Sequence, residues 1–217
     1  MSRRGRPKLK RGRAKRKPVR KFYLICEGEK TEPDYFNALM AVFRPAQIEF
    51  VYTSGAGVPM TVAKKAFDIL KANGLDKKGR KSKDSFEKDD EVWAVFDKDE
   101  HPKYQEAKNY CGAKEINVAY SDPCFELWVN LHFCDSDGPC DRVKAQKTTE
   151  KLMKDYSRKG GKTADFSPIV ENLDDAERRA EGMAARRIDE GNSDGNPSTS
   201  VHLLTQSIKR AAKASKP

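Results

Sequence analysis

The chain has 217 residues, with 43 Lys and Arg against 33 Asp and Glu, and this length can build one sizeable core with a small appendage. No apolar run approaches the ~20 residues of a membrane helix, so we expect no membrane partner and a cytoplasmic location. The five cysteines form no C-x-x-C pair, which argues against a standard zinc or disulfide framework.

The first 21 residues hold 12 of the Lys and Arg residues and no acid, so the remainder is nearly neutral. Residues 1–21 contain glycines and prolines and almost no large apolar side chain, and we predict a disordered basic arm. Such an arm attracts phosphate backbones without reading sequence, although it could also be a solubilising tail. Its candidate nucleic-acid contacts are Arg11, Arg13, Lys15, Arg16 and Lys17.

Past the arm, apolar runs and helical spacing alternate along the chain. Short apolar runs predict strands at 22–26, 48–53, 91–100 and 116–121. Helices are predicted at 31–43, 60–74 and 102–112 from helix-start signals, a terminal glycine and apolar residues at helical spacing. Residues 75–90 are polar and highly charged, which predicts a surface loop. This order predicts an α/β, Rossmann-like fold, in which helices flank a mostly parallel sheet and ligands bind at the carboxyl edge of the strands.

Carboxylates directly follow two of these strands. Glu27 comes after the first strand, and Asp97 and Asp99 come at the end of the third. Because the carboxyl ends of parallel strands meet at one edge of a sheet, we expect the three carboxylates to converge there. Such a cluster raises its own pKa values unless a divalent cation neutralises it, and carboxylate oxygens suit Mg²⁺, with Mn²⁺ as a substitute. The pattern predicts a metal site that holds phosphate oxygens and helps to activate water.

Two further residues belong to the same candidate site. Glu126 follows the fourth strand, and it either faces the same ion or only stabilises the first turn of a helix. Lys30 either contacts a phosphate or pairs with Glu27 or Glu29. The predicted catalytic residues are therefore Glu27, Asp97, Asp99 and Glu126, of which Glu27, Asp97 and Asp99 are the predicted metal ligands.

The C-terminal half carries less specific signals. The spacing of His132, Cys134 and Cys140 matches no standard zinc pattern, so reduced, structural cysteines are favoured over a zinc site. His132 is favoured as a packed or surface helix residue over a catalytic base. The mixed charges of 174–191 predict a solvated helix face, or one that faces a partner. Residues 194–211 begin with turn residues and predict a helix capped by Asn196 or Ser198.

Four motifs in chain order carry a resemblance to a known family: "CEGEKTEPDYF", "FDKDE", "SDPCFELWVNLHF" and "NPSTSVHLL". Together they resemble the RloB-like family, which includes the abortive-infection component AbiLii. The likeness spans nearly all of residues 22–212. It implies a Toprim-like core at 22–133, a helical extension at 140–212 and a tail at 213–217.

The resemblance also implies a function. In the Toprim pattern, Glu27, Asp97 and Asp99 would be the metal-binding catalytic triad. The family likeness further implies a role in phage defence and a partner ATPase of the AAA type with an OLD-like or SMC-like head. The sequence departs from the family at Asp122, where members often have asparagine, and this residue either adds a carboxylate to the site or has no role there.

Two functions follow as expectations. The first is a Mg²⁺-dependent nuclease that cuts DNA or RNA, with tRNA among the candidate targets, after activation by the ATPase. The second is a non-catalytic sensor or adaptor that binds nucleic acid or the ATPase. The intact set of acids favours the nuclease.

Overall fold

The computed structural model describes residues 19–43, 48–83, 87–98, 101–136 and 138–214. Five strands form one sheet in the order β2-β1-β3-β4-β5, and only β5 runs antiparallel to its neighbour. The strands are β1 (Arg20–Cys26), β2 (Ile48–Thr53), β3 (Glu91–Asp97), β4 (Asn117–Asp122) and β5 (Ser198–Thr199). The predicted α/β fold with a mostly parallel sheet is confirmed.

Strand β1 is buried on both faces, as its continuous apolar run predicts. Phe22 and Leu24 belong to one core, and Tyr23 and Ile25 belong to the other, because side chains alternate along a strand. The strand pairs with β2 on one side and β3 on the other. This central position places Glu27, the next residue, at the carboxyl edge of the sheet between two neighbouring strands.

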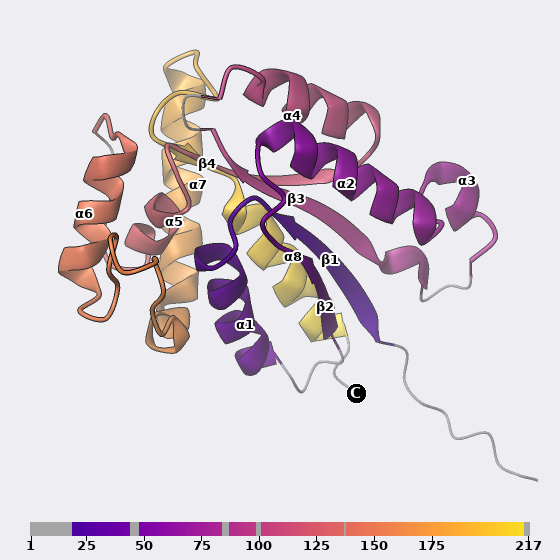
Figure 1. Cartoon of the computed structure of the whole chain (residues 1–217), viewed down its shortest axis with the longest axis horizontal. Coiled ribbons are helices and arrows are strands. Elements are labelled where there is room, and N and C mark those ends of the chain that lie inside the picture. Colours follow the sequence, from indigo (N-terminus) through magenta and orange to yellow (C-terminus); the bar gives the residue numbers. More distant parts are fainter. Residues whose placement is uncertain (1–18, 44–47, 84–86, 99–100, 137, 215–217) are drawn as a thin grey trace, which may run out of the picture.

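Helices cover both faces of the sheet (Figure 1). One face carries α2 (Pro59–Ala72) and α4 (Tyr104–Ala113), with the short α3 (Lys77–Arg80) and the 3-10 turn Glu87–Asp89 nearby in the chain. The other face carries the larger core. Its helices are α1 (Thr31–Phe43), α5 (Glu126–Leu131), α7 (Leu173–Asp189), α8 (Val201–Ala214) and the 3-10 turn Ser167–Asn172, and α6 (Arg142–Leu152) packs against α5.

The C-terminal helices belong to the same core as the N-terminal strands. Met183 of α7 and Ile208 of α8 are fully buried in the cluster that also contains Leu24 of β1. Immediately before α8, Ser198 and Thr199 add the antiparallel strand β5 to the sheet. The sequence did not predict β5, because two residues are too few to show a strand pattern.

The predicted end of the basic arm and the expected lack of a membrane helix can be compared with the structure. The arm was predicted to extend to residue 21, but β1 begins at Arg20, whose guanidinium pairs with Glu91 of β3. The predicted arm contacts and Asp99 lie outside the described residues. No helix in the described parts of the chain is both long and apolar enough to cross a membrane.

Candidate functional site: an acidic pocket at the sheet edge

A pocket of about 470 Å³ opens at the carboxyl edge of the parallel strands. Its lining combines acidic and basic side chains, which is typical of a site for a charged ligand. The acids are Glu27, Glu29, Glu32, Asp97 and Glu126, and the basic residues are Lys30, His101, Arg142 and Lys162.

The ends of β1 and β3 hold the two acids at the centre of the prediction. The Glu27 amide donates a hydrogen bond to the Val95 carbonyl at 2.9 Å, which continues the β1–β3 pairing by one residue. Glu27 Oε2 then accepts a hydrogen bond from the Asp97 amide at 3.2 Å. The structure therefore brings Glu27 and Asp97 together, while Asp99 lies outside the described residues.

Glu126 enters the same pocket from the first residue of α5. Its side chain is only 3% exposed, and Oε1 accepts hydrogen bonds from the Tyr156 hydroxyl at 2.5 Å and from Gln146 Nε2 at 3.5 Å. Its position in the first turn of α5 also lets it interact favourably with the helix dipole. Since it is buried and lines the same pocket as Asp97, Glu126 is part of the acidic cluster as well.

Glu32 is a further member of this cluster that the sequence did not reveal. It lies in the first turn of α1, is 5% exposed, and its Oε1 accepts a hydrogen bond from the Gly28 amide at 3.0 Å. A side chain on residue 28 would place its Cβ 2.4 Å from Glu32 Oε2, so any larger residue here would force the Glu32 carboxylate to move. Burial raises the pKa of Glu32 to about 6, and the charges of Glu126 and Glu27 add to the shift.

The pKa of Asp97 is shifted by burial and by the charged groups around it. Burial raises its pKa well above the usual value, and the negative charges of Glu32 and Glu126 raise it further. Arg142, the first residue of α6, opposes this shift, because its Nη2 lies 3.3 Å from Asp97 Oδ2. His101 approaches the neighbouring acid, with Nε2 at 3.4 Å from Glu27 Oε1.

The donor set fits a hard divalent cation by its chemistry. Several carboxylates share one pocket and raise the pKa values of Glu32 and Asp97, and a cation would relieve this repulsion. Within the described ranges, however, no three His, Cys, Asp or Glu side chains are grouped closely enough to hold a metal ion. Instead, Glu27, Glu32 and Glu126 accept hydrogen bonds from protein donors, and Asp97 pairs with Arg142.

The zinc interpretation of His132 does not agree with the structure. His132 Nε2 lies 3.1 Å from the Tyr35 hydroxyl, and Nδ1 lies 3.1 Å from the Trp128 carbonyl oxygen. Both ring nitrogens are thus engaged inside the core, and burial lowers the pKa of His132 to about 4. His132 is a packed residue, as the sequence favoured.

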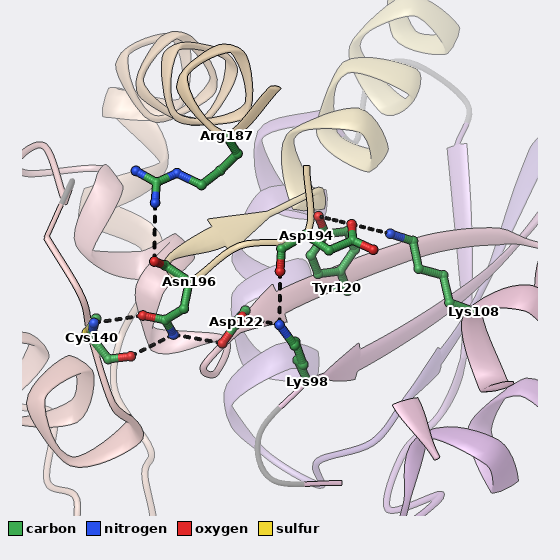
Figure 2. Close-up of polar contacts among 8 residues, drawn as sticks. All are labelled: Lys98, Lys108, Tyr120, Asp122, Cys140, Arg187, Asp194 and Asn196. Carbon is green, nitrogen blue, oxygen red and sulfur yellow. Dashed lines mark hydrogen bonds and ion pairs between the residues drawn. The ribbon is translucent and has the colours of Figure 1, made fainter. Parts of the chain in front are cut away.

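Asp122, the last residue of β4, does not line the pocket, and its side chain contacts Lys98 and Asn196 (Figure 2). Its Oδ2 accepts a hydrogen bond from Lys98 Nζ at 2.8 Å, and its Oδ1 accepts one from Asn196 Nδ2 at 2.8 Å. Asn196 also bonds the amide of Cys140 at 2.8 Å and its carbonyl at 2.7 Å. The predicted helix-capping role of Asn196 is wrong, because its side chain instead joins β4 to the loop before α6. Ser198 does not cap the helix either, since it lies in β5.

We predict that Asp122→Asn lowers the free energy of unfolding by about 1 kcal/mol. An asparagine oxygen can still accept from Asn196, but the charge opposite Lys98 is lost from a partly exposed pair. Asp122→Ala should cost more, about 2 kcal/mol, since it leaves both donors without their acceptor. Urea unfolding of the two variants checks this order, and equal costs would contradict it.

Comparison with known proteins yields one match. A protein-family model described as RloB-like protein matches residues 22–208. No curated protein and no solved structure matches the chain. The matched range begins within β1 and ends within α8, so it includes every described residue of the acidic pocket.

Proposed function

The chain belongs to the RloB-like protein family, and from this premise we propose that it is a metal-dependent nuclease that hydrolyses phosphodiester bonds in DNA or RNA. One observation carries the proposal: acids from β1, α1, β3 and α5 meet in a single pocket at the carboxyl edge of a parallel sheet. This edge is where open α/β sheets bind ligands. The Toprim-like motif pattern supports the same assignment.

In this proposal Glu27, Asp97 and Asp99 would hold Mg²⁺ or Mn²⁺, and Glu126 would be a further acid beside them. The bound cation would supply a Lewis acid for the phosphoryl oxygens and lower the pKa of a water. Lys30 and Lys162 line the pocket and bind the negatively charged phosphate. Arg142 holds Asp97 by its ion pair and would place positive charge beside the substrate phosphate.

A cleavage assay tests this function directly. We expect the purified full chain to cut plasmid, single-stranded DNA or total tRNA in the presence of Mg²⁺ or Mn²⁺, and to lose activity when the metal is chelated. Glu126→Gln should lower the rate by roughly 10²-fold, because a buried negative charge of the acidic cluster is removed. The matched control is Glu171→Gln, on an exposed 3-10 turn. Cleavage that persists in the chelator would refute the proposal.

The alternative is a non-catalytic module that binds nucleic acid or a partner. The pairing of Asp97 with Arg142 at 3.3 Å favours this reading, since an arginine already neutralises a predicted ligand. In the same assay, the alternative predicts binding of nucleic acid without cleavage under every metal condition. We place the nuclease first because the negative charges of Glu32 and Glu126 still surround Asp97 despite its pairing with Arg142.

The family likeness extends the proposal to partners. We propose that an AAA-type ATPase with an OLD-like or SMC-like head controls the nuclease, and that the pair acts in phage defence by abortive infection. Cleavage assays with and without the ATPase test this part. A rate that is the same in both would argue against control by the ATPase.

A further inference from the structure

The segment from Arg142 to Lys162, which contains α6 and the loop after it, is strongly basic. Eight of its residues are Lys or Arg and only Glu150 and Asp155 are acidic. Helix α7 is different, because it has nearly equal numbers of acids and arginines and several of them pair with each other or with α8. The first segment therefore carries a clear net positive charge, whereas the charges of α7 are nearly balanced.

Helix α6 points its lysines away from the core. On the inner side, Ala145 is fully buried and the Thr149 hydroxyl donates to Asn130 Oδ1 of α5 at 2.9 Å. On the outer side, Lys144, Lys147 and Lys151 are exposed, and their spacing places them on one face of the helix. A shallow groove of about 380 Å³ follows this face, lined by Lys144, Lys147, Thr148 and Lys151 among others.

We name the exposed lysines of this segment the basic strip, and they are Lys144, Lys147, Lys151, Lys154 and Lys159. Among the residues that the structure describes, none of the five forms an ion pair with an acid. Lysines elsewhere do, such as Lys71 with Asp76 and Lys77 with Glu115. Positive charge that the fold does not neutralise is available to an external polyanion.

Both ends of the segment reach the acidic pocket. At its start, Arg142 pairs with Asp97. At its end, Lys162 lines the pocket, and the Lys162 carbonyl oxygen accepts a hydrogen bond from the Thr31 hydroxyl at 3.2 Å. Figure 1 shows α6 at the edge of the molecule beside α5, and the pocket residues Arg142 and Lys162 lie at the two ends of the segment that carries the strip.

We propose that the basic strip is a docking surface for the phosphate backbone of a nucleic acid, and that it guides the strand into the acidic pocket. The second half of this statement rests on the proposed nuclease function. Lys144 and Lys151 are about 10 Å apart along the helix axis, which is roughly the length of three phosphates of one DNA strand. A phosphodiester is also the group that the pocket would take, which favours a nucleic acid over an acidic protein as the occupant.

Salt-dependent binding tests the docking surface. The test variant is the full chain with Lys144→Gln, Lys147→Gln and Lys151→Gln, and the probes are fluorescein-labelled DNA and RNA duplexes of one sequence, in EDTA. We expect binding at low salt to weaken about tenfold or more, and the slope of log affinity against log salt to become less steep by about 3. Loss with only one duplex assigns the surface to that nucleic acid.

The matched control carries Lys64→Gln, Lys78→Gln and Lys81→Gln, three exposed lysines on or next to α2 and α3 at the opposite face of the sheet. The control and wild-type proteins should bind alike. If the test variant also binds both duplexes with the wild-type affinity and salt slope, the proposal is overturned. An acidic protein then becomes the expected partner of these lysines. Glutamine keeps the helix propensity of lysine, so circular dichroism should confirm an intact fold in both variants.

The binding test and the cleavage test can refute the docking surface and the nuclease independently of each other. Because binding is measured in EDTA, it does not depend on a metal-dependent reaction. A wild-type protein that binds through the strip but never cuts nucleic acid refutes the nuclease and supports the docking surface. A test variant that binds normally, with an active wild-type enzyme, refutes the docking surface and leaves the nuclease in place.

Discussion

Replacing Asp97 by asparagine is expected to lower metal-dependent cleavage of nucleic acid by roughly 10³-fold. Asparagine keeps the size of the side chain but removes the charge that would help to hold the cation, and several kcal/mol of transition-state stabilisation correspond to this factor. The fold should not weaken, because burial and the charges of Glu32 and Glu126 already make the ionised form of Asp97 unfavourable. Initial rates and thermal melting of the variant measure both effects.

The matched control for this variant is Asp68→Asn, on the exposed side of α2. It makes the same chemical change on the far face of the sheet and should leave the cleavage rate unchanged. A second measurement is the rise in melting temperature that Mn²⁺ produces in the wild-type protein, since a ligand that binds only the folded state stabilises it. That rise should shrink in Asp97→Asn. Cleavage within tenfold of wild type would show that Asp97 is not required.

Lowering the pH from 6.5 to 4 is expected to cost the wild-type protein about 3 kcal/mol of stability through His132 alone. Burial lowers the folded-state pKa of His132 to about 4, below the ordinary value of 6.5. Between these values the unfolded chain binds the proton more tightly, so stability is present above pH 6.5 and is lost as the pH falls. The measurement is urea unfolding of wild type and His132→Gln across this range.

The informative quantity is the difference between the two proteins at each pH. Glu32, with its pKa raised to about 6, favours folding as the pH falls, but it is present in both proteins and cancels in the difference. Tyr35→Phe is the matched control, because it removes the partner of His132 Nε2 and leaves the histidine in place. Its pH dependence should follow wild type. If wild type and His132→Gln weaken in parallel, His132 does not carry the effect.

Local patterns were sufficient to predict the four parallel strands of the sheet and the meeting of Glu27 with Asp97 in the pocket. The apolar run of β1 predicted a strand buried on both faces, and the structure has it in the middle of the sheet. Since neighbouring parallel strands end at one edge, Glu27 and Asp97 were expected to meet, and they do so through the hydrogen bond between Glu27 Oε2 and the Asp97 amide. Both inferences depend on residues within one or two elements.

Two members of the site, Glu32 and Arg142, were not predicted from the sequence. Glu32 has the sequence signature of an ordinary acid in the first turn of a helix. Its place in the pocket follows from the turn between β1 and α1, where its side chain accepts a hydrogen bond from the Gly28 amide four residues earlier. Arg142 begins a helix 45 residues after Asp97, and its role in the pocket depends on how α6 packs against α5.

The motifs that looked separate in the sequence are joined only in the folded chain. Asp122 was expected either to add a carboxylate to the site or to have no role there, but it binds Lys98 and Asn196 outside the pocket lining. The sequence by itself determined the α/β class, the central strand and the meeting of Glu27 with Asp97, because hydrophobic periodicity and strand direction act locally. The tertiary structure alone decided the partners of Asp97, Asp122 and His132, because these depend on packing between elements tens of residues apart.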